Sequence, residues 1–191
     1  SYYTVLYAGD SERDLVSDFS SMQGDHVILG VPEGDEIIWL ECTEQDKPFG
    51  YLGNFTDDRD VLIVTDEGGK IVHTKVYSDT ENLQEYSASV RLNSEGGITG
   101  FLEGKYQGLQ YDGKYFWDKI TDQEKRTAYK ERWGYINGLK INDVNLIDNK
   151  TDVIFTEKIN IQASNYATKI GSDLLLCANV FNQSQYIPSR S

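Results

Sequence analysis

Few residues of this chain belong to the types that usually build a metal or redox site. Its 191 residues include two cysteines, Cys42 and Cys177, and two histidines. Neither cysteine lies in a CxxC motif or in a Cys/His cluster, so no zinc site is indicated. We therefore expect no metal ion and no cofactor.

Positive charge is also scarce. Lysine and arginine together number 18 against 31 acidic residues, which gives a formal net charge of −13 at pH 7. Such a chain repels phosphate backbones unless its basic residues are concentrated in one place, and the densest basic run, residues 125–132, is interrupted by glutamate. That pattern is typical of a solvated helix face, so nucleic acid is not an expected partner.

Long apolar runs are missing as well. No segment approaches the roughly 18 consecutive apolar residues of a membrane-spanning helix, so no membrane span is expected. No signal peptide opens the sequence. The sequence starts directly on a strand-like run, SYYTVLYAG, which indicates a fragment of a longer protein. A small protein without a leader is the alternative.

What the chain does have is an abundance of strand-forming residues. Aromatic residues make up 12%, with 13 tyrosines and 7 phenylalanines, and they favour β structure. Strands are predicted over residues 2–8, 26–31, 36–42, 61–65, 70–76, 86–92, 98–106, 153–161 and 174–181. Turn residues interrupt the pattern before residue 60, so we predict two domains, residues 1–59 and 60–191.

The second predicted domain contains one well-signalled helix. Thr121 and Glu124 have the spacing of a capping box, in which each side chain satisfies a backbone amide of the first turn. From Tyr129 onward an apolar residue recurs at i+4 and i+7, which predicts a narrow buried stripe. The predicted fold class is therefore mainly β (α+β), with one helix near residues 121–136.

The first predicted domain contains a hairpin, GDHVILGVPEGDEIIWLECTEQ, with a histidine on one strand and a glutamate on the other. A two-residue loop at Glu33-Gly34 places His26 directly opposite Glu41, on one side of the sheet. The carboxylate would fix the tautomer of the imidazole and orient it, as in the base-and-acid half of a nucleophile–His–acid site. The alternative is a weak ion pair on a structural hairpin.

No nucleophile for such a site is evident in the sequence. Cys42 directly follows Glu41 and is expected on the opposite face of the strand, while Cys177 is expected to be buried on a later strand. No G-x-S-x-G motif occurs. The other histidine, His73, has no acidic partner by local spacing and is interpreted as a surface residue.

The stretch HVILGVPEGDEIIWLECT resembles the histidine and acid strands of the transglutaminase-like superfamily, which has a papain-like Cys-His-Asp triad. The resemblance is clearest over residues 1 to about 75 and is closest to bacterial multi-domain members. It implies that His26 is the family histidine and Glu41 the family acid, which is usually an aspartate. The family cysteine lies at a helix N-terminus well upstream of the histidine, and nothing before residue 25 corresponds to it.

The resemblance implies that the chain holds the final antiparallel strands of a transglutaminase-like core, followed by a β-sandwich-like C-terminal domain. In the intact protein, upstream domains of the same polypeptide would supply the cysteine for acyl transfer or for amide or peptide hydrolysis. These residues alone would be inactive. A bacterial periplasmic or extracellular location is expected over a cytoplasmic one.

A noncatalytic binding or structural module is the alternative function. The stretch YQGLQYDGKYFWD, from Tyr106 to Asp118, could present its rings to a glycan or peptide, or the rings could fill the faces of a β-sandwich. Joint exposure of Tyr111, Tyr115 and Trp117 would favour the binding module.

Overall fold

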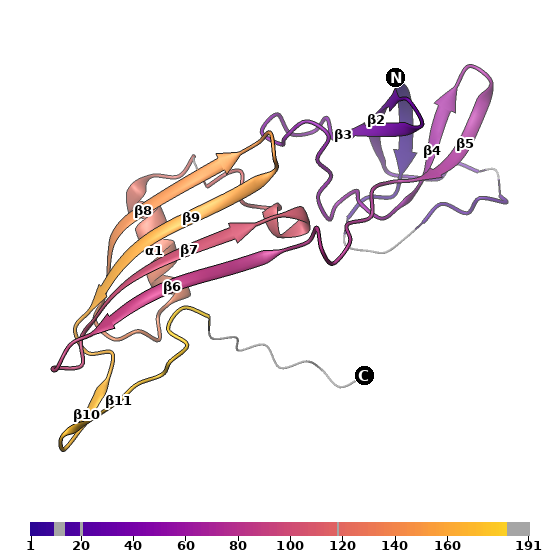
Figure 1. Cartoon of the computed structure of the whole chain (residues 1–191). Helices are drawn as coiled ribbons and strands as arrows, with labels where there is room; N and C mark the ends of the chain where they lie inside the picture. Colours follow the sequence, from indigo (N-terminus) through magenta and orange to yellow (C-terminus); the bar gives the residue numbers. More distant parts are fainter. Residues whose placement is uncertain (10–13, 20, 118, 183–191) are drawn as a thin grey trace. The chain divides into compact units, whose positions relative to one another are not determined.

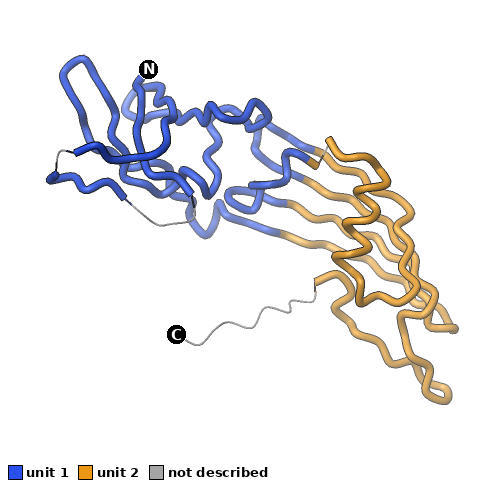
Figure 2. Tube along the Cα trace, turned by 180° about the vertical axis from the view of Figure 1, so that it is seen from behind, with its two compact units in different colours: residues 1–84, 106–116, 148–155 blue, residues 85–105, 117–147, 156–191 orange. Residues whose placement is uncertain are grey.

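The computed structural model describes residues 1–9, 14–19, 21–117 and 119–182, which fold into two compact units (Figure 2). Unit 1 draws on residues 1–84, 106–116 and 148–155, and unit 2 draws on residues 85–105, 117–147 and 156–191. The described chain is mainly β with antiparallel sheets, as predicted, and contains a single α-helix. Within the described residues no helix is both long enough and apolar enough to span a membrane.

Unit 1 contains a five-stranded antiparallel sheet (Figure 1). Its strands are β1 (Tyr2–Leu6), β2 (His26–Glu33), β3 (Glu36–Leu40), β4 (Asp60–Thr65) and β5 (Gly68–His73). They lie in the order β3-β2-β1-β4-β5, so β1 is the central strand and pairs with β2 on one side and β4 on the other. The two hairpins of the sequence thus flank the first strand.

The structure divides at a different place from the predicted boundary at residue 59. β4 pairs with β1, with Ile63 opposite Thr4, and so satisfies backbone groups that β1 would otherwise leave open on that edge. Residues 60–84 therefore belong with residues 1–59 in unit 1. Unit 1 also gathers two later segments, so its limits are not contiguous in the sequence.

Both faces of this sheet carry apolar side chains. One face forms a buried core of Leu6, Ile28, Trp39, Leu52, Val61 and Ile63. The strand register places two apolar rows on the other face, Val27–Val5–Leu62 and Leu29–Tyr3–Val64. Tyr3, Val27 and Val64 are exposed there, and the other three are half-buried. This second face, which we call the open face, is apolar without being fully covered.

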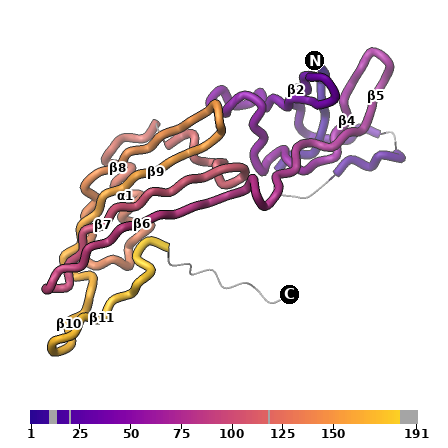
Figure 3. Tube along the Cα trace, viewed as in Figure 1, coloured from indigo at the N-terminus to yellow at the C-terminus, as the bar shows by residue number. Residues whose placement is uncertain are grey.

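A second sheet has four strands that lie side by side in the order β6-β7-β9-β8, neighbouring strands running antiparallel (Figure 3). The strands are β6 (Gln84–Leu92), β7 (Ile98–Tyr106), β8 (Leu139–Asn149) and β9 (Ile154–Ala163). A short 3-10 helix (Gly108–Tyr111) and a two-stranded ribbon, β10 (Thr168–Ile170) with β11 (Asp173–Leu175), complete the elements. The last predicted strand, 174–181, is therefore much shorter than expected.

The helix α1 (Asp122–Arg132) begins with the predicted capping box. The backbone amide of Glu124 donates to the Thr121 hydroxyl at 3.3 Å, and the Glu124 carboxylate accepts from the Thr121 amide at 2.8 Å. Tyr129 and Trp133 are fully buried against the sheet residues of unit 2, which confirms the apolar stripe. The helix ends four residues earlier than predicted, because Trp133 is already its C-cap.

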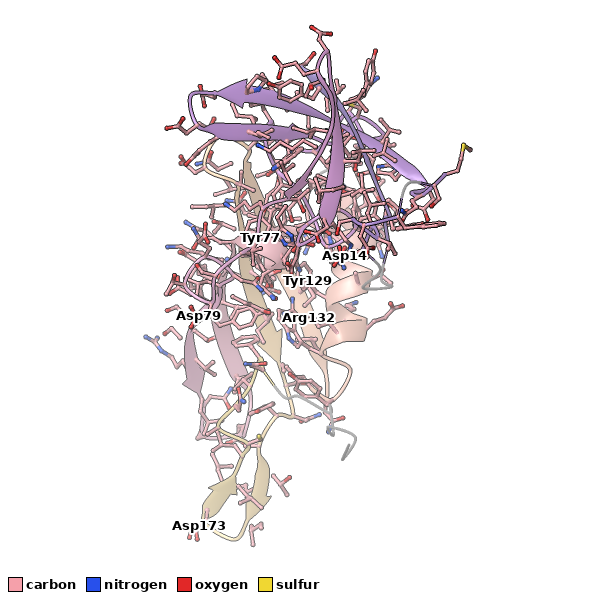
Figure 4. The ribbon with its side chains drawn as sticks, turned by 90° about the vertical axis from the view of Figure 1, so that its right-hand side faces the viewer. Asp14, Tyr77, Asp79, Tyr129, Arg132 and Asp173 are labelled. Carbon is pink, nitrogen blue, oxygen red and sulfur yellow. The ribbon has the colours of Figure 1, made fainter. Side chains whose placement is uncertain are left out.

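A buried glutamate on β9 joins α1 to the sheet. The side chain of Glu157 is 1% exposed and accepts a hydrogen bond from the Tyr129 hydroxyl at 2.6 Å. Arg132 donates to the same carboxylate at 3.1 Å, and both partners project from α1 (both are labelled in Figure 4). Burial raises the pKa of Tyr129, so its hydroxyl stays protonated and able to donate.

We expect E157A to lower the free energy of unfolding by about 2 kcal/mol, because it leaves the buried Tyr129 hydroxyl without this acceptor. E157Q, which keeps an acceptor oxygen, should cost less. Urea unfolding followed by fluorescence measures both, with E103A on β7 as the control, since Glu103 is only half-buried. Equal losses in E157A and E103A would contradict this role.

Candidate functional site

His26 and Glu41 are in contact, as the sequence predicts. His26 opens β2 and Glu41 directly follows β3. The imidazole Nε2 lies 3.0 Å and 3.2 Å from the two carboxylate oxygens. The His26 side chain is 14% exposed and the Glu41 side chain 1% exposed, so this is a largely dehydrated pair and not a solvated surface ion pair.

The predicted hairpin register is wrong, although the contact is present. The structure pairs Glu33 with Glu36 and Leu29 with Leu40, so the loop is Gly34-Asp35 and the pairing is shifted by two residues. Gly34 has φ +62°, a conformation that favours glycine. A two-residue shift keeps every side chain on its face of the sheet, so Glu41 reaches the histidine diagonally.

The same shift moves Trp39. Trp39 lies opposite Gly30, and a Cβ on that glycine would meet the indole ring at 3.1 Å. A larger residue at position 30 would therefore crowd the indole ring. Trp39 is buried in the core of the sheet and contributes to the dry surroundings of the His–Glu pair.

Thr43 completes the environment of the carboxylate. Its backbone amide and its hydroxyl both donate to Glu41 Oε1, at 3.1 Å and 2.8 Å. Burial raises the pKa of Glu41, but the hydrogen bonds from Thr43 and His26 together outweigh it and hold the pKa below the usual glutamate value. The ionised carboxylate only accepts hydrogen bonds, so Nε2 carries the ring proton and Nδ1 carries the lone pair.

The Nδ1 side of the ring is the side available for chemistry. Within the described residues no protein group forms a hydrogen bond to Nδ1, while the ring of Phe55 meets the imidazole edge-on at 5.4 Å. Cys42 is exposed, and its thiol lies 3.5 Å from the carbonyl of Leu40. Cys42 lies just beyond β3, and no hydrogen bond joins it to His26 among the described residues.

Cys177 differs from its prediction. It lies beyond β11 and is exposed, so it is not the buried strand residue that the sequence indicated. No group of three or more histidine, cysteine or acidic side chains placed to hold a metal ion occurs among the described residues. The described part of the chain thus brings an oriented imidazole together with its acid but brings no thiol to them.

The interpretation of His73 as a residue without an acidic partner is wrong. Its Nδ1 lies 2.7 Å from Asp60 and its Nε2 lies 2.8 Å from Asp58. Hydrogen bonds first to Asp60 and then to Asp58 raise the pKa of His73. The signal was present in the sequence, because closing the β4–β5 hairpin around its Asp66-Glu67 turn places residue 60 opposite residue 73.

The aromatic stretch does not form an exposed platform. Tyr111 is fully buried and donates to Asp148 at 2.7 Å. Tyr115 is half-buried, with its ring stacked on that of Tyr111. Trp117 is half-buried as well and packs against Tyr129, while Asp118 lies outside the described residues. The binding module would require the three rings to be exposed together, and they are not.

We expect E41Q to lower the free energy of unfolding at neutral pH by about 1–3 kcal/mol, because it removes charged hydrogen bonds. Since the pKa of Glu41 is lowered in the folded state, its contribution is present above the ordinary value of about 4.3 and is lost as pH falls through the lower folded value. The difference between the wild type and E41Q should therefore shrink on acidification. Urea unfolding at several pH values, with the exposed Glu36 changed in E36Q as control, measures it.

The stability contributed by the cluster of His73, Asp58 and Asp60 has the opposite pH dependence. Because its pKa is raised, the cluster contributes stability below the ordinary histidine value of about 6.5 and loses it as pH rises through the higher folded value. We expect an NMR titration to find His73 titrating above that value and D60N to bring it down. D66N, at an exposed position of the same hairpin turn, is the control, and an unchanged titration in D60N would contradict the assignment.

Comparisons with known proteins find no relative of this chain. No family model, no curated protein and no solved structure matches the chain. The role of the site is therefore argued from the arrangement of His26, Glu41 and Thr43.

Proposed function

We propose that unit 1 carries the base-and-acid half of a cysteine-type site for acyl transfer or amide hydrolysis. The nucleophilic thiol comes from another segment of the same polypeptide, outside these residues. The observation that carries the proposal is the buried carboxylate on Nε2 of His26, which leaves Nδ1 as the basic nitrogen on the side without a protein hydrogen bond. By itself this chain is inactive.

Each step of the proposed reaction uses that nitrogen. Nδ1 takes the proton of the thiol, and the thiolate attacks an amide carbonyl carbon. When the C–N bond breaks, Nδ1 returns the proton to the leaving nitrogen and a thioester remains. An amine or water then gives its proton to Nδ1 and attacks the thioester, which releases the thiol. Glu41 stabilises the imidazolium form throughout.

The hairpin register supports glutamate as the acid of this site. The resemblance to the transglutaminase-like superfamily implies an aspartate at this position, and glutamate is longer by one methylene. Directly opposed residues have Cβ atoms about 5 Å apart, whereas diagonal neighbours are about 7–8 Å apart. Because Glu41 reaches His26 diagonally, the extra methylene spans the added distance, and an aspartate would fall short.

The exposed apolar side chains of the open face support the proposal that a further part of the polypeptide covers it. Strands that are apolar on both sides are typical of sheets covered on both faces. Only one face of this sheet is closed, while Tyr3, Val27 and Val64 remain exposed on the other. In this proposal, unit 1 is the final sheet of a transglutaminase-like core, upstream domains of the polypeptide cover the open face, and unit 2 is the β-rich domain that follows.

Two proteins test the proposal: this 191-residue chain and the natural polypeptide that contains it. Ammonia release from a glutaminyl peptide, with and without an added amine, measures activity. We expect none from the chain alone and turnover from the natural polypeptide, reduced about a thousandfold in H26A. E41D should also lower turnover, because the shorter aspartate side chain cannot span the diagonal distance to His26.

D66N, at an exposed turn residue of unit 1 outside the site, is the control and should keep full activity. Turnover by the 191-residue chain alone, or full activity of H26A in the natural polypeptide, would sink the proposal.

A further inference from the structure

Unit 1 contains a second site, a cavity of about 320 Å³ that is separate in its residues from the His–Glu pair. It is bounded by the loop at residues 49–51, by residues 75–81, by the start of the 3-10 helix, and by the β8–β9 turn. All of these segments belong to unit 1. The volume is at the lower end of the range for small-ligand pockets, which suits a single ring and not a large cofactor.

Three aromatic residues, Phe49, Tyr51 and Tyr77, are among those that line the cavity. Phe49 is 72% exposed at the cavity, an unusual position for a phenyl ring. The rings of Tyr51 and Tyr77 stand 6.3 Å apart at 49° (Tyr77 is labelled in Figure 4). Their hydroxyls donate to backbone carbonyls, Tyr51 to Gly108 at 3.2 Å and Tyr77 to Leu52 at 2.8 Å. The two tyrosines are thus fixed by their hydroxyls beside the cavity.

Polar side chains line the cavity beside these rings. Lys75 and Glu81 form an ion pair at 3.1 Å. The side-chain amide of Gln107 has no hydrogen-bond partner within the described residues and so has donors and an acceptor to offer. One carboxylate oxygen of Asp152 accepts from Asn149 at 2.8 Å, which holds the group in place at the cavity.

The backbone at the cavity is strained. Val153 has φ +53°, and a β-branched residue in the left-handed region is an outlier. It lies in the β8–β9 turn beside Asp152, and both line the cavity. Strain of this kind persists where the surrounding structure enforces it and is concentrated at ligand sites. The outlier is an observation independent of the lining chemistry.

We infer that this cavity binds a neutral hexopyranose ring of a glycan. The apolar C–H face of a sugar ring packs on an aromatic face, and its hydroxyls pair with amide and carboxylate groups, which is the combination that Phe49, Gln107 and Asp152 provide. This inference does not depend on the proposed reaction at His26, because none of its residues takes part there.

Other ligand classes fit less well. An anion is disfavoured by the net charge of −13 and by Asp152 at the cavity. A cation is disfavoured because the Nζ of Lys75 already lies over the Tyr77 ring, 4.6 Å from its centroid, and would repel a second positive charge. A peptide usually adds to an open strand edge, but the backbone lining this cavity lies in turns and loops.

The test is an NMR titration of the ¹⁵N-labelled 191-residue chain with cellotriose and with triacetylchitotriose, both neutral oligosaccharides. We expect at least one of them to shift the amide signals of Gly50, Gly108 and Val153, with a dissociation constant on the order of 1 mM. F49A and Q107A should each weaken that binding about fivefold or more. F116A, which removes an exposed phenylalanine of unit 1 outside the cavity, should leave it unchanged.

Three results overturn the inference: no shift of these amides with either sugar, equal affinity in F49A and the wild type, or shifts with trialanine but with neither sugar. The ¹H–¹⁵N spectrum of each variant reports directly whether it is folded. Because the readout is binding and H26A leaves the cavity intact, a failure here is distinct from a failure of the proposed reaction.

Discussion

The buried carboxylate of Glu41 is the constraint around which the end of the β2–β3 hairpin is built. A charge that is 1% exposed is costly unless its lone pairs are occupied, and three donors from two residues occupy them. Thr43 lies in a bend shortly after β3 and donates two of these hydrogen bonds. The ring of His26 is then held between this carboxylate and the edge of Phe55. The orientation of the imidazole is thus a consequence of satisfying one buried charge.

Side-chain length and hairpin register determine each other at this site. The loop at Gly34-Asp35 sets the diagonal relation of His26 and Glu41, and that relation needs the reach of a glutamate. A loop placed one residue earlier would bring the two directly opposite, where an aspartate suffices. A change of acid between related sites therefore does not by itself indicate loss of function. It indicates that the turn and the side chain have to be compared together.

The sequence predicts local features well and long-range ones poorly. Alternation and turn residues locate the β1–β5 strands, and the spacing of Thr121 and Glu124 predicts the start of α1 correctly, because those signals act over a few residues. The hairpin register is missed because Glu33-Gly34 and Gly34-Asp35 are both plausible turns. The limits of unit 1 are missed because β4 pairs with β1 across more than fifty residues. The His–Glu contact is predicted correctly only because the register is wrong by two residues, which keeps both side chains on the same face of the sheet.

Three acidic sites in this chain, at Glu41, at Glu157 and around His73, differ in whether a partner has a basic nitrogen left for chemistry. Glu157 is as buried as Glu41, but the partners described for it are a tyrosine and an arginine, neither of which exchanges protons near neutral pH. The aspartates beside His73 raise its pKa and engage both of its nitrogens, so none is left to act as a base. His26 alone among these has one nitrogen fixed by a buried carboxylate and the other without a protein hydrogen bond. That asymmetry, more than burial or charge, distinguishes the site at the hairpin from the structural pairs.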